Sequence, residues 1–205
     1  MADDDRDKPA VSRRAFLKGG AVATGALSTT LLPVLPAEAQ LPDATAPDPR
    51  RSTIELRVNG VPTRVQVPNN TTLLDLLRGE AKLTGAKMGC ERAMCGACTV
   101  IANGRSVYAC TALAVDMAGA EVTTIEGLAS GDRLHPIQQA FVEQSGYQCG
   151  FCTSGQIMST KALLDRIPRP SEEQVREGLA GNLCRCAAYK RIIQSVMTAS
   201  RLMQA

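Results

Sequence analysis

Eight cysteines in a chain of 205 residues limit what this sequence can fold into more than any other feature. They fall into two sets of four with different spacings. The N-terminal set follows the pattern C-x4-C-x2-C-x11-C and comprises Cys90, Cys95, Cys98 and Cys110. The C-terminal set joins a C-x2-C pair to a C-x-C pair and comprises Cys149, Cys152, Cys184 and Cys186. The chain has three Tyr, three Phe and no Trp, so small hydrophobic cores would contain few large side chains. Each cysteine set could supply the cross-links or the metal site that stabilise one such core.

The N-terminal set has the plant-type spacing of thiolates that bind a [2Fe–2S] cluster. Four sulfurs must converge on two irons there, with backbone N–H groups wrapped closely around them. The loop of residues 89–98 is rich in Gly and Ala, and glycine permits positive φ and close backbone approach. The sequence therefore predicts a [2Fe–2S] site at this loop.

The C-terminal set is less specific, because a C-x2-C pair also fits zinc or a redox dithiol. Each of its pairs, however, directly precedes a predicted helix. Helix N-termini carry free N–H groups and a positive dipole end, which stabilise negatively charged thiolates. Two helix starts facing each other would hold a second diiron centre.

Four disulfides and structural zinc are the competing explanations for eight cysteines. A C-x-C pair can hardly be bridged internally, and the plant-type spacing is unusual for zinc. The one histidine, His135, precedes a proline at a predicted helix start, so we expect a surface or capping residue rather than a ligand. Both explanations are therefore minor alternatives.

The first 39 residues resemble a twin-arginine export signal. Arg13 and Arg14 precede an apolar run, and Ala37-Glu38-Ala39 offers a signal-peptidase site. A bilayer span needs about 20 apolar residues, and this run is shorter and interrupted, so we expect no permanent membrane span. Because this route exports folded, cofactor-loaded proteins, the leader predicts a periplasmic protein that acquires its metal in the cytoplasm.

The rest of the chain divides into a Pro-rich linker, 40–52, and two predicted domains, 53–127 and 128–205. The first reads as a small mixed sheet with one helix: strands at 54–58, 61–67, 98–102, 106–110 and 121–125, and a helix near 73–77. The second reads as a bundle of four helices at 134–143, 153–167, 171–179 and 189–203. The fold class is therefore α+β. A net charge of +3 argues against a nucleic-acid partner.

Three motifs carry a resemblance to a known family: G-C-E-R-A-M-C-G-A-C-T-V, Q-C-G-F-C-T-S-G-Q and G-N-L-C-R-C-A-A-Y. They resemble the iron–sulfur subunit of the xanthine oxidase family of molybdenum hydroxylases, and with this leader the periplasmic aldehyde oxidoreductases most of all. The resemblance covers the chain from Thr53 onward. It implies a ferredoxin-like β-grasp domain followed by a four-helix bundle, with two [2Fe–2S] clusters bound by the eight cysteines. The sequence departs from the family at Ala93, commonly Gly, and at Ala187, commonly Gly or Thr.

The resemblance further implies an electron-transfer subunit of an oxidoreductase, with no catalytic residue on this chain. A large subunit would hold the molybdenum–pterin cofactor and oxidise an aldehyde. A medium subunit would hold FAD and accept the electrons. Gln148 matches a position that contacts the pterin in relatives. The alternatives are a hydroxylase of N-heterocycles with a cytochrome acceptor, or an exported binding or sensor protein stapled by disulfides.

Overall fold

The computed structural model describes residues 48–204, all of which belong to one compact unit, Thr45–Ala205. The predicted signal peptide, 1–39, and most of the predicted linker, 40–52, lie outside the described residues. Within residues 48–204, no helix is both long enough and apolar enough to cross a membrane.

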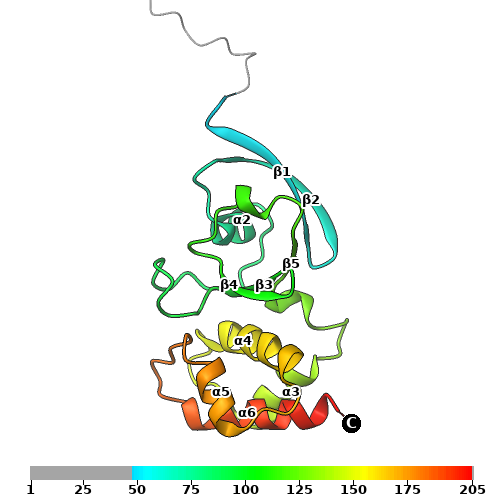
Figure 1. Cartoon of the computed structure of the whole chain (residues 1–205), viewed down its shortest axis with the longest axis vertical. Coiled ribbons are helices and arrows are strands. Elements are labelled where there is room, and N and C mark those ends of the chain that lie inside the picture. Colours follow the sequence, from blue (N-terminus) through cyan, green and yellow to red (C-terminus); the bar gives the residue numbers. More distant parts are fainter. Residues whose placement is uncertain (1–47, 205) are drawn as a thin grey trace, which may run out of the picture. The chain divides into compact units, whose positions relative to one another are not determined.

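A five-stranded mixed sheet forms the first half of the described chain (Figure 1). Two antiparallel hairpins, β1–β2 and β3–β4, turn at Asn59-Gly60 and Asn103-Gly104, where all four residues have positive φ, as tight hairpin turns require. The last strand runs parallel to β1 and antiparallel to β3, giving the order β2-β1-β5-β3-β4. The strands are β1 (Arg51–Val58), β2 (Val61–Pro68), β3 (Thr99–Ala102), β4 (Arg105–Tyr108) and β5 (Glu121–Thr123).

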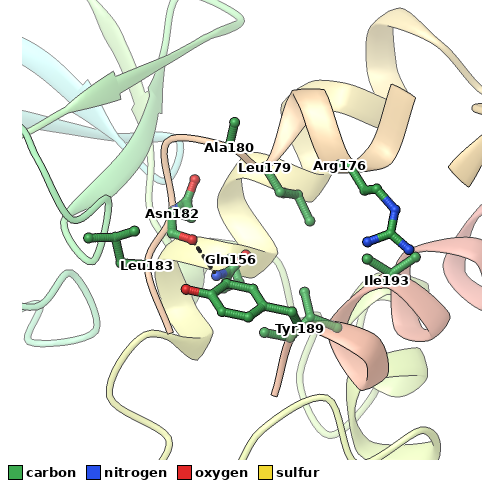
Figure 2. Close-up of a pocket in the computed structure, with 9 residues that line it drawn as sticks. Gln156, Arg176, Leu179, Ala180, Asn182, Leu183, Tyr189 and Ile193 are labelled. Carbon is green, nitrogen blue, oxygen red and sulfur yellow. Dashed lines mark hydrogen bonds between the residues drawn. The ribbon is translucent and has the colours of Figure 1, made fainter. Parts of the chain in front are cut away.

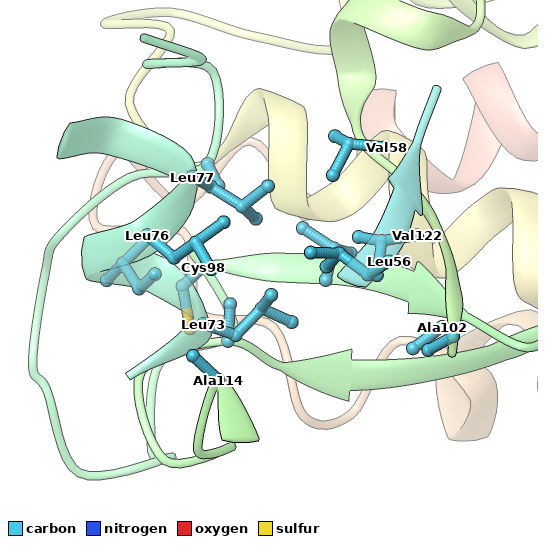
Figure 3. Close-up of a cluster of buried hydrophobic side chains, with 14 of the residues drawn as sticks. Leu56, Val58, Leu73, Leu76, Leu77, Cys98, Ala102, Ala114 and Val122 are labelled. Carbon is cyan, nitrogen blue, oxygen red and sulfur yellow. The ribbon is translucent and has the colours of Figure 1, made fainter. Parts of the chain in front are cut away.

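One helix, α2 (Leu73–Gly79), supplies much of the core of this half (Figure 3). Its start is capped by Thr72, whose side chain accepts a hydrogen bond from the backbone N–H of Asp75. Four of its leucines are buried: Leu73, Leu74, Leu76 and Leu77. They belong to the same buried cluster as Leu56, Val58 and Val122 of the sheet, and Cys98 and Cys110 are also members of it. Two of the four cysteines of the N-terminal set are therefore part of the first hydrophobic core.

Four helices form the second half around a separate buried cluster. They are α3 (Pro136–Glu143), α4 (Thr153–Arg166), α5 (Glu172–Gly178) and α6 (Tyr189–Leu202). Helix α3 packs on α6, and α4 packs both on its neighbours and on strand β3. Among the helices, α4 thus makes the main contact with the sheet.

The α+β fold class and the order of the predicted elements are confirmed, with differences at their ends. Strand β1 begins at Arg51, inside the predicted linker, because Arg51 and Ser52 pair with the end of β2. Helix α3 begins at Pro136 rather than at residue 134, because His135 caps it. The strand predicted at 121–125 ends at Thr123, since residues Ile125–Gly127 form a 3-10 turn (η2).

Candidate metal centres

The β3–β4 hairpin brings two cysteines of the N-terminal set together. Cys98 directly precedes β3 and Cys110 follows β4, and the N–H of Ala109 donates to the carbonyl of Cys98 at 3.4 Å. Both thiols are buried, with residue exposures of 3% and 7%. The two thiols are close enough for Cys110 to affect the pKa of Cys98. This pair forms the inner side of the first set.

The loop before the hairpin holds the other two members of this set, Cys90 and Cys95, whose thiols also interact. Glu91, Ala93 and Gly96 all have positive φ, so the loop curls around its own sulfurs. The N–H of Met94 points at Cys90 Sγ at 3.4 Å. A Cβ added at Gly89 would come within 3.1 Å of Cys95 Sγ. This pair is less buried than the inner one and forms the outer side.

The C-terminal set lies at the starts of α4 and α6, as the sequence predicted. Cys152 is the residue that caps α4, and the C-x-C pair ends shortly before Tyr189, the first residue of α6. The thiols again form two neighbouring pairs, Cys149 with Cys186 and Cys152 with Cys184. At the second helix start, the N–H of Ala188 reaches Cys184 Sγ at 3.4 Å. Cys149 is exposed and Cys184 is buried, so this set also has an outer and an inner side.

Four of the thiols differ in acidity. Backbone N–H donors at Arg92 and Met94 lower the pKa of Cys90 to about 7, and a donor at Phe151 lowers the pKa of Cys149. Burial raises the pKa of Cys98 to about 12, and it does the same for Cys152, to about 12. Without metal, Cys90 and Cys149 are therefore readier thiolates than Cys98 and Cys152, and metal binding must displace protons from Cys98 and Cys152.

This pairwise arrangement fits a diiron cluster better than a single ion. Within residues 48–204, no three His, Cys, Asp or Glu side chains surround a point where one metal ion could bind. A [2Fe–2S] cluster has four cysteine ligands for two irons, so it needs two pairs of thiols rather than four thiols around one point. Each set offers two such pairs, together with N–H groups aimed at sulfur. The residues present therefore fit two [2Fe–2S] clusters.

A cavity of about 620 Å³ lies between the two cysteine sets and is lined by both. Phe151, Leu183 and Tyr189 form part of its wall, and all three are exposed by more than two fifths. The N–H of Leu183 donates to the carbonyl of Cys95 at 2.9 Å, so a residue next to one set is bonded to a member of the other. The structure thus places the two predicted sites beside each other.

A second, smaller cavity of about 350 Å³ adjoins the C-x-C loop (Figure 2). Figure 2 shows Gln156 beside Asn182 in its lining, where Gln156 Nε2 donates to the carbonyl of Asn182 at 3.1 Å. Gln156 is 1% exposed, and its Oε1 atom has no partner among the residues described. On the rim, the Tyr189 hydroxyl accepts the N–H of Cys184 at 3.0 Å.

The remaining predicted residue, Gln148, is exposed and stands beside the exposed Cys149. Sequence reasoning assigned no role to Asn182, Tyr108 or Tyr189, although Asn182 and Tyr189 lie within the last motif. Their contacts reach across the fold or into the cysteine loop. The motif singled out their region, but only the structure shows what they bind. His135 caps α3, as expected.

Two domain families match the chain. The 2Fe-2S iron-sulfur cluster binding domain matches residues 56–125, and the [2Fe-2S] binding domain matches residues 124–197. The aldehyde oxidoreductase iron-sulfur-binding subunit of Escherichia coli K12 is 42% identical over 93% of this chain and 88% of its own length. This chain belongs to the iron–sulfur subunits of the molybdenum hydroxylase family.

The names of other members of the molybdenum hydroxylase family refer to different substrates. One subunit of the nicotinate dehydrogenase of Pseudomonas putida is 47% identical over 73% of this chain and 96% of its own length. Among solved structures, quinoline 2-oxidoreductase from P. putida 86 has a TM-score of 0.73 and 36% identity, covering 76% of this chain and 97% of its own. Aldehyde oxidoreductase from Desulfovibrio desulfuricans has a TM-score of 0.72 and 44% identity, covering 74% of this chain and 17% of its own.

These relatives confirm the resemblance and the fold. The ferredoxin-like and helical halves are those of the xanthine oxidase family, and the chain is an iron–sulfur component of an oxidoreductase. They also support two 2Fe-2S domains and a role in electron transfer.

Proposed function

We propose that this chain is the electron-transfer subunit of a molybdenum-dependent aldehyde oxidoreductase. It receives electrons from a molybdenum–pterin centre on a large partner protein and delivers them to an FAD-binding subunit. The observation that carries the proposal is the pairing of thiols in two neighbouring sets that line one cavity. Two sites for one-electron groups so close together suit electron relay rather than substrate chemistry. The aldehyde oxidoreductase subunit of E. coli, similar over nearly the whole chain, supports the reaction class.

The eight cysteines are the proposed ligands, two for each iron. The N-terminal site would use Cys90 with Cys95 and Cys98 with Cys110, and the C-terminal site would use Cys149 with Cys186 and Cys152 with Cys184. When bound, each [2Fe–2S] cluster supplies one-electron redox chemistry. The chain's own contribution is to bury the inner thiols and to aim the N–H groups of Met94 and Ala188 at sulfur, which stabilises negative charge there.

The outer edge of the C-terminal set is the proposed contact with the molybdenum subunit. Gln148, Cys149 and Phe151 are all exposed there, Phe151 by 48%. An exposed aromatic beside an exposed ligand is typical of a surface that a partner covers. We propose that Gln148 contacts the pterin across this surface. Electrons would pass between the two sites by way of the hydrogen bond that the N–H of Leu183 donates to the carbonyl of Cys95.

A hydroxylase of N-heterocycles is the second candidate for the whole complex. The similarity to the nicotinate dehydrogenase of P. putida and to quinoline 2-oxidoreductase favours it. In that case the acceptor could be a cytochrome in place of FAD. The remaining alternative, an exported binding or sensor protein with disulfide bonds, is not supported by the family to which the chain belongs.

Purification of the native complex under anaerobic conditions tests the proposal. We expect a molybdenum–pterin protein and a flavoprotein to co-purify with the chain, and an aldehyde to bleach the visible absorbance of the iron–sulfur chromophores. Faster bleaching by nicotinate or quinoline than by benzaldehyde would favour the second candidate. A haem protein in place of the flavoprotein would overturn the proposed acceptor. A chain that purifies without a molybdenum protein would contradict the proposed function.

We also propose that residues 1–39 export the protein to the periplasm by the twin-arginine route. The support is the arginine pair, the apolar run and the cleavage site, in that order. Replacing Arg13 and Arg14 together by lysine should leave the protein in the cytoplasmic fraction with both clusters bound. Unchanged export of that variant would refute the assignment.

A further inference from the structure

Residues 181–183, here called the bridge segment, bind the loop of the N-terminal cysteine set. The Tyr108 hydroxyl donates to the carbonyl of Gly181 at 3.1 Å, and the N–H of Leu183 donates to the carbonyl of Cys95 at 2.9 Å. Between them, Asn182 Nδ2 donates to the carbonyl of Gly96 at 3.0 Å. The bridge segment directly precedes Cys184. Each of its residues therefore connects one cysteine set to the surroundings of the other.

Asn182 is the only residue of the bridge segment whose side chain makes these contacts. It is 5% exposed, and its Nδ2 also approaches Thr99 Oγ1 at 3.4 Å. Its Oδ1 accepts a hydrogen bond from Ser159 Oγ of helix α4 at 2.7 Å. One amide group thus has its donor on the sheet half and its acceptor on the helical half. A buried amide satisfied on both sides has little freedom to turn.

Two glycines allow the halves to approach this closely. A Cβ added at Gly155, in the first turn of α4, would overlap the carbonyl oxygen of Gly96. A Cβ added at Gly96 would lie 2.5 Å from both Asn182 Nδ2 and the oxygen of Gly181. Backbone therefore meets backbone at this contact, and any side chain there would force the halves apart.

We propose that Asn182 is a positioning residue that fixes the separation of the two cysteine sets. The inference rests on the proposed function, because its consequence is the electronic coupling between the two clusters that these sets hold. Gly96 lies between Cys95 and Cys98, and Asn182 lies two residues before Cys184. A shift at their hydrogen bond therefore moves one set of ligands relative to the other. A residue that only stabilised the fold would change the melting temperature and leave the coupling as it is.

The magnetic coupling between the two reduced clusters measures this separation. Dipolar coupling falls with the cube of distance, and it is read as splitting in low-temperature EPR spectra of the fully reduced full-length protein. Asn182→Asp keeps the size of the side chain and the acceptor for Ser159, but sets a carboxylate oxygen against the Gly96 carbonyl. Gly155→Ala inserts a methyl group at the same contact. We expect both variants to keep both EPR signals and to show a smaller splitting than the wild type.

Ser159→Ala is the matched control. It removes the side-chain bond to α4 and leaves Asn182 bonded to Gly96 and Thr99. The carbonyl of Asn182 stays bonded to Gln156 of α4, so we expect the wild-type splitting. Tyr108→Phe removes only the hydroxyl bond to Gly181, and we expect it to show a smaller splitting than the wild type. This variant tests the contact even if Asn182→Asp and Gly155→Ala do not fold. Wild-type splitting in every variant that holds both clusters would overturn the proposal, as would an equal loss in Ser159→Ala. A wild-type protein that lacks either signal would instead contradict the proposed function.

Discussion

Two alanines, Ala93 and Ala187, adopt left-handed backbone conformations, each with φ of 56°. Both lie in cysteine loops, at the two positions where the resemblance predicted other residues: glycine in place of Ala93, and glycine or threonine in place of Ala187. A left-handed conformation brings Cβ close to the following carbonyl and costs roughly 1–2 kcal/mol for a residue other than glycine. The loops hold this conformation because their N–H groups must face the sulfurs. The strain is therefore a local consequence of building a thiolate site with alanine.

Replacing Ala93 or Ala187 by glycine should raise the apparent melting temperature of the cluster-loaded protein. Relief of the strain outweighs the extra chain entropy of glycine by about 1 kcal/mol or less, which corresponds to roughly 2–4 °C at most for a domain of this size. Scanning calorimetry of the loaded protein measures the shift.

Ala162→Gly is the control for these substitutions, because Ala162 lies inside α4. Glycine in a helix interior costs about 1 kcal/mol relative to alanine, so this variant should melt lower. A decrease of the same size in Ala93→Gly and Ala187→Gly would show that neither loop is strained.

At the scale of single elements, helix α3 shows how a local signal sets a boundary. His135 Nδ1 accepts the N–H of Ile137 at 3.2 Å, and Gln138 Oε1 accepts the N–H of His135 at 2.9 Å. Together these bonds form a capping box, with Pro136 in the first turn. The sequence predicted this helix, and it also predicted His135 as a surface or capping residue. It placed the start two residues early, because Leu134 continues the apolar pattern although it precedes the cap.

The His135 cap should make stability depend on pH. Desolvation by burial, and then the charge of Lys161, lower the pKa of His135 from its ordinary value of 6.5, against an opposing effect of Asp165. The folded protein thus binds fewer protons than the unfolded chain below pH 6.5. The free energy of unfolding should therefore decrease as the pH falls from about 6.5 through the lowered pKa. Protonation of Nδ1 also removes the acceptor for Ile137.

His135→Asn isolates this contribution, because asparagine caps a helix well and does not titrate. The melting temperatures of wild type and variant, followed from pH 7.5 to 5, give the difference directly, because this range extends about one unit above and about one and a half units below an ordinary histidine pKa. We expect the wild type to lose more stability than the variant over this range. Parallel curves would contradict a titrating cap.

Local patterns also predicted the hairpins and the helix starts at the cysteines, because turns and caps depend on neighbouring residues. They could not predict how β5 joins the sheet. It runs parallel to β1 and pairs with it at Arg57 and Val58, more than 60 residues away along the chain. Such pairing depends on which apolar faces meet, not on the sequence of the strand itself.

At the scale of the whole molecule, two small cores are each joined to a cysteine set, and the sets meet at one cavity. The sequence predicted eight ligands in two groups from the cysteine spacing, from the predicted helix starts and from the family resemblance. It did not reveal that the groups adjoin, because the contacts that join them link residues such as Tyr108 and Gly181, or Gly96 and Asn182, that are far apart in the chain. The arrangement accounts for the high cysteine content of a chain with few aromatic residues.

The iron content and EPR spectrum of the anaerobically reduced protein test the central claim most directly. Two [2Fe–2S] clusters require about four irons per chain, and we expect two distinguishable signals. Cys95→Ser should abolish or alter only one signal, and Cys152→Ser only the other, because each cysteine belongs to a different set. About two irons per chain, a single signal in the wild type, or loss of both signals in either variant would contradict two independent cluster sites.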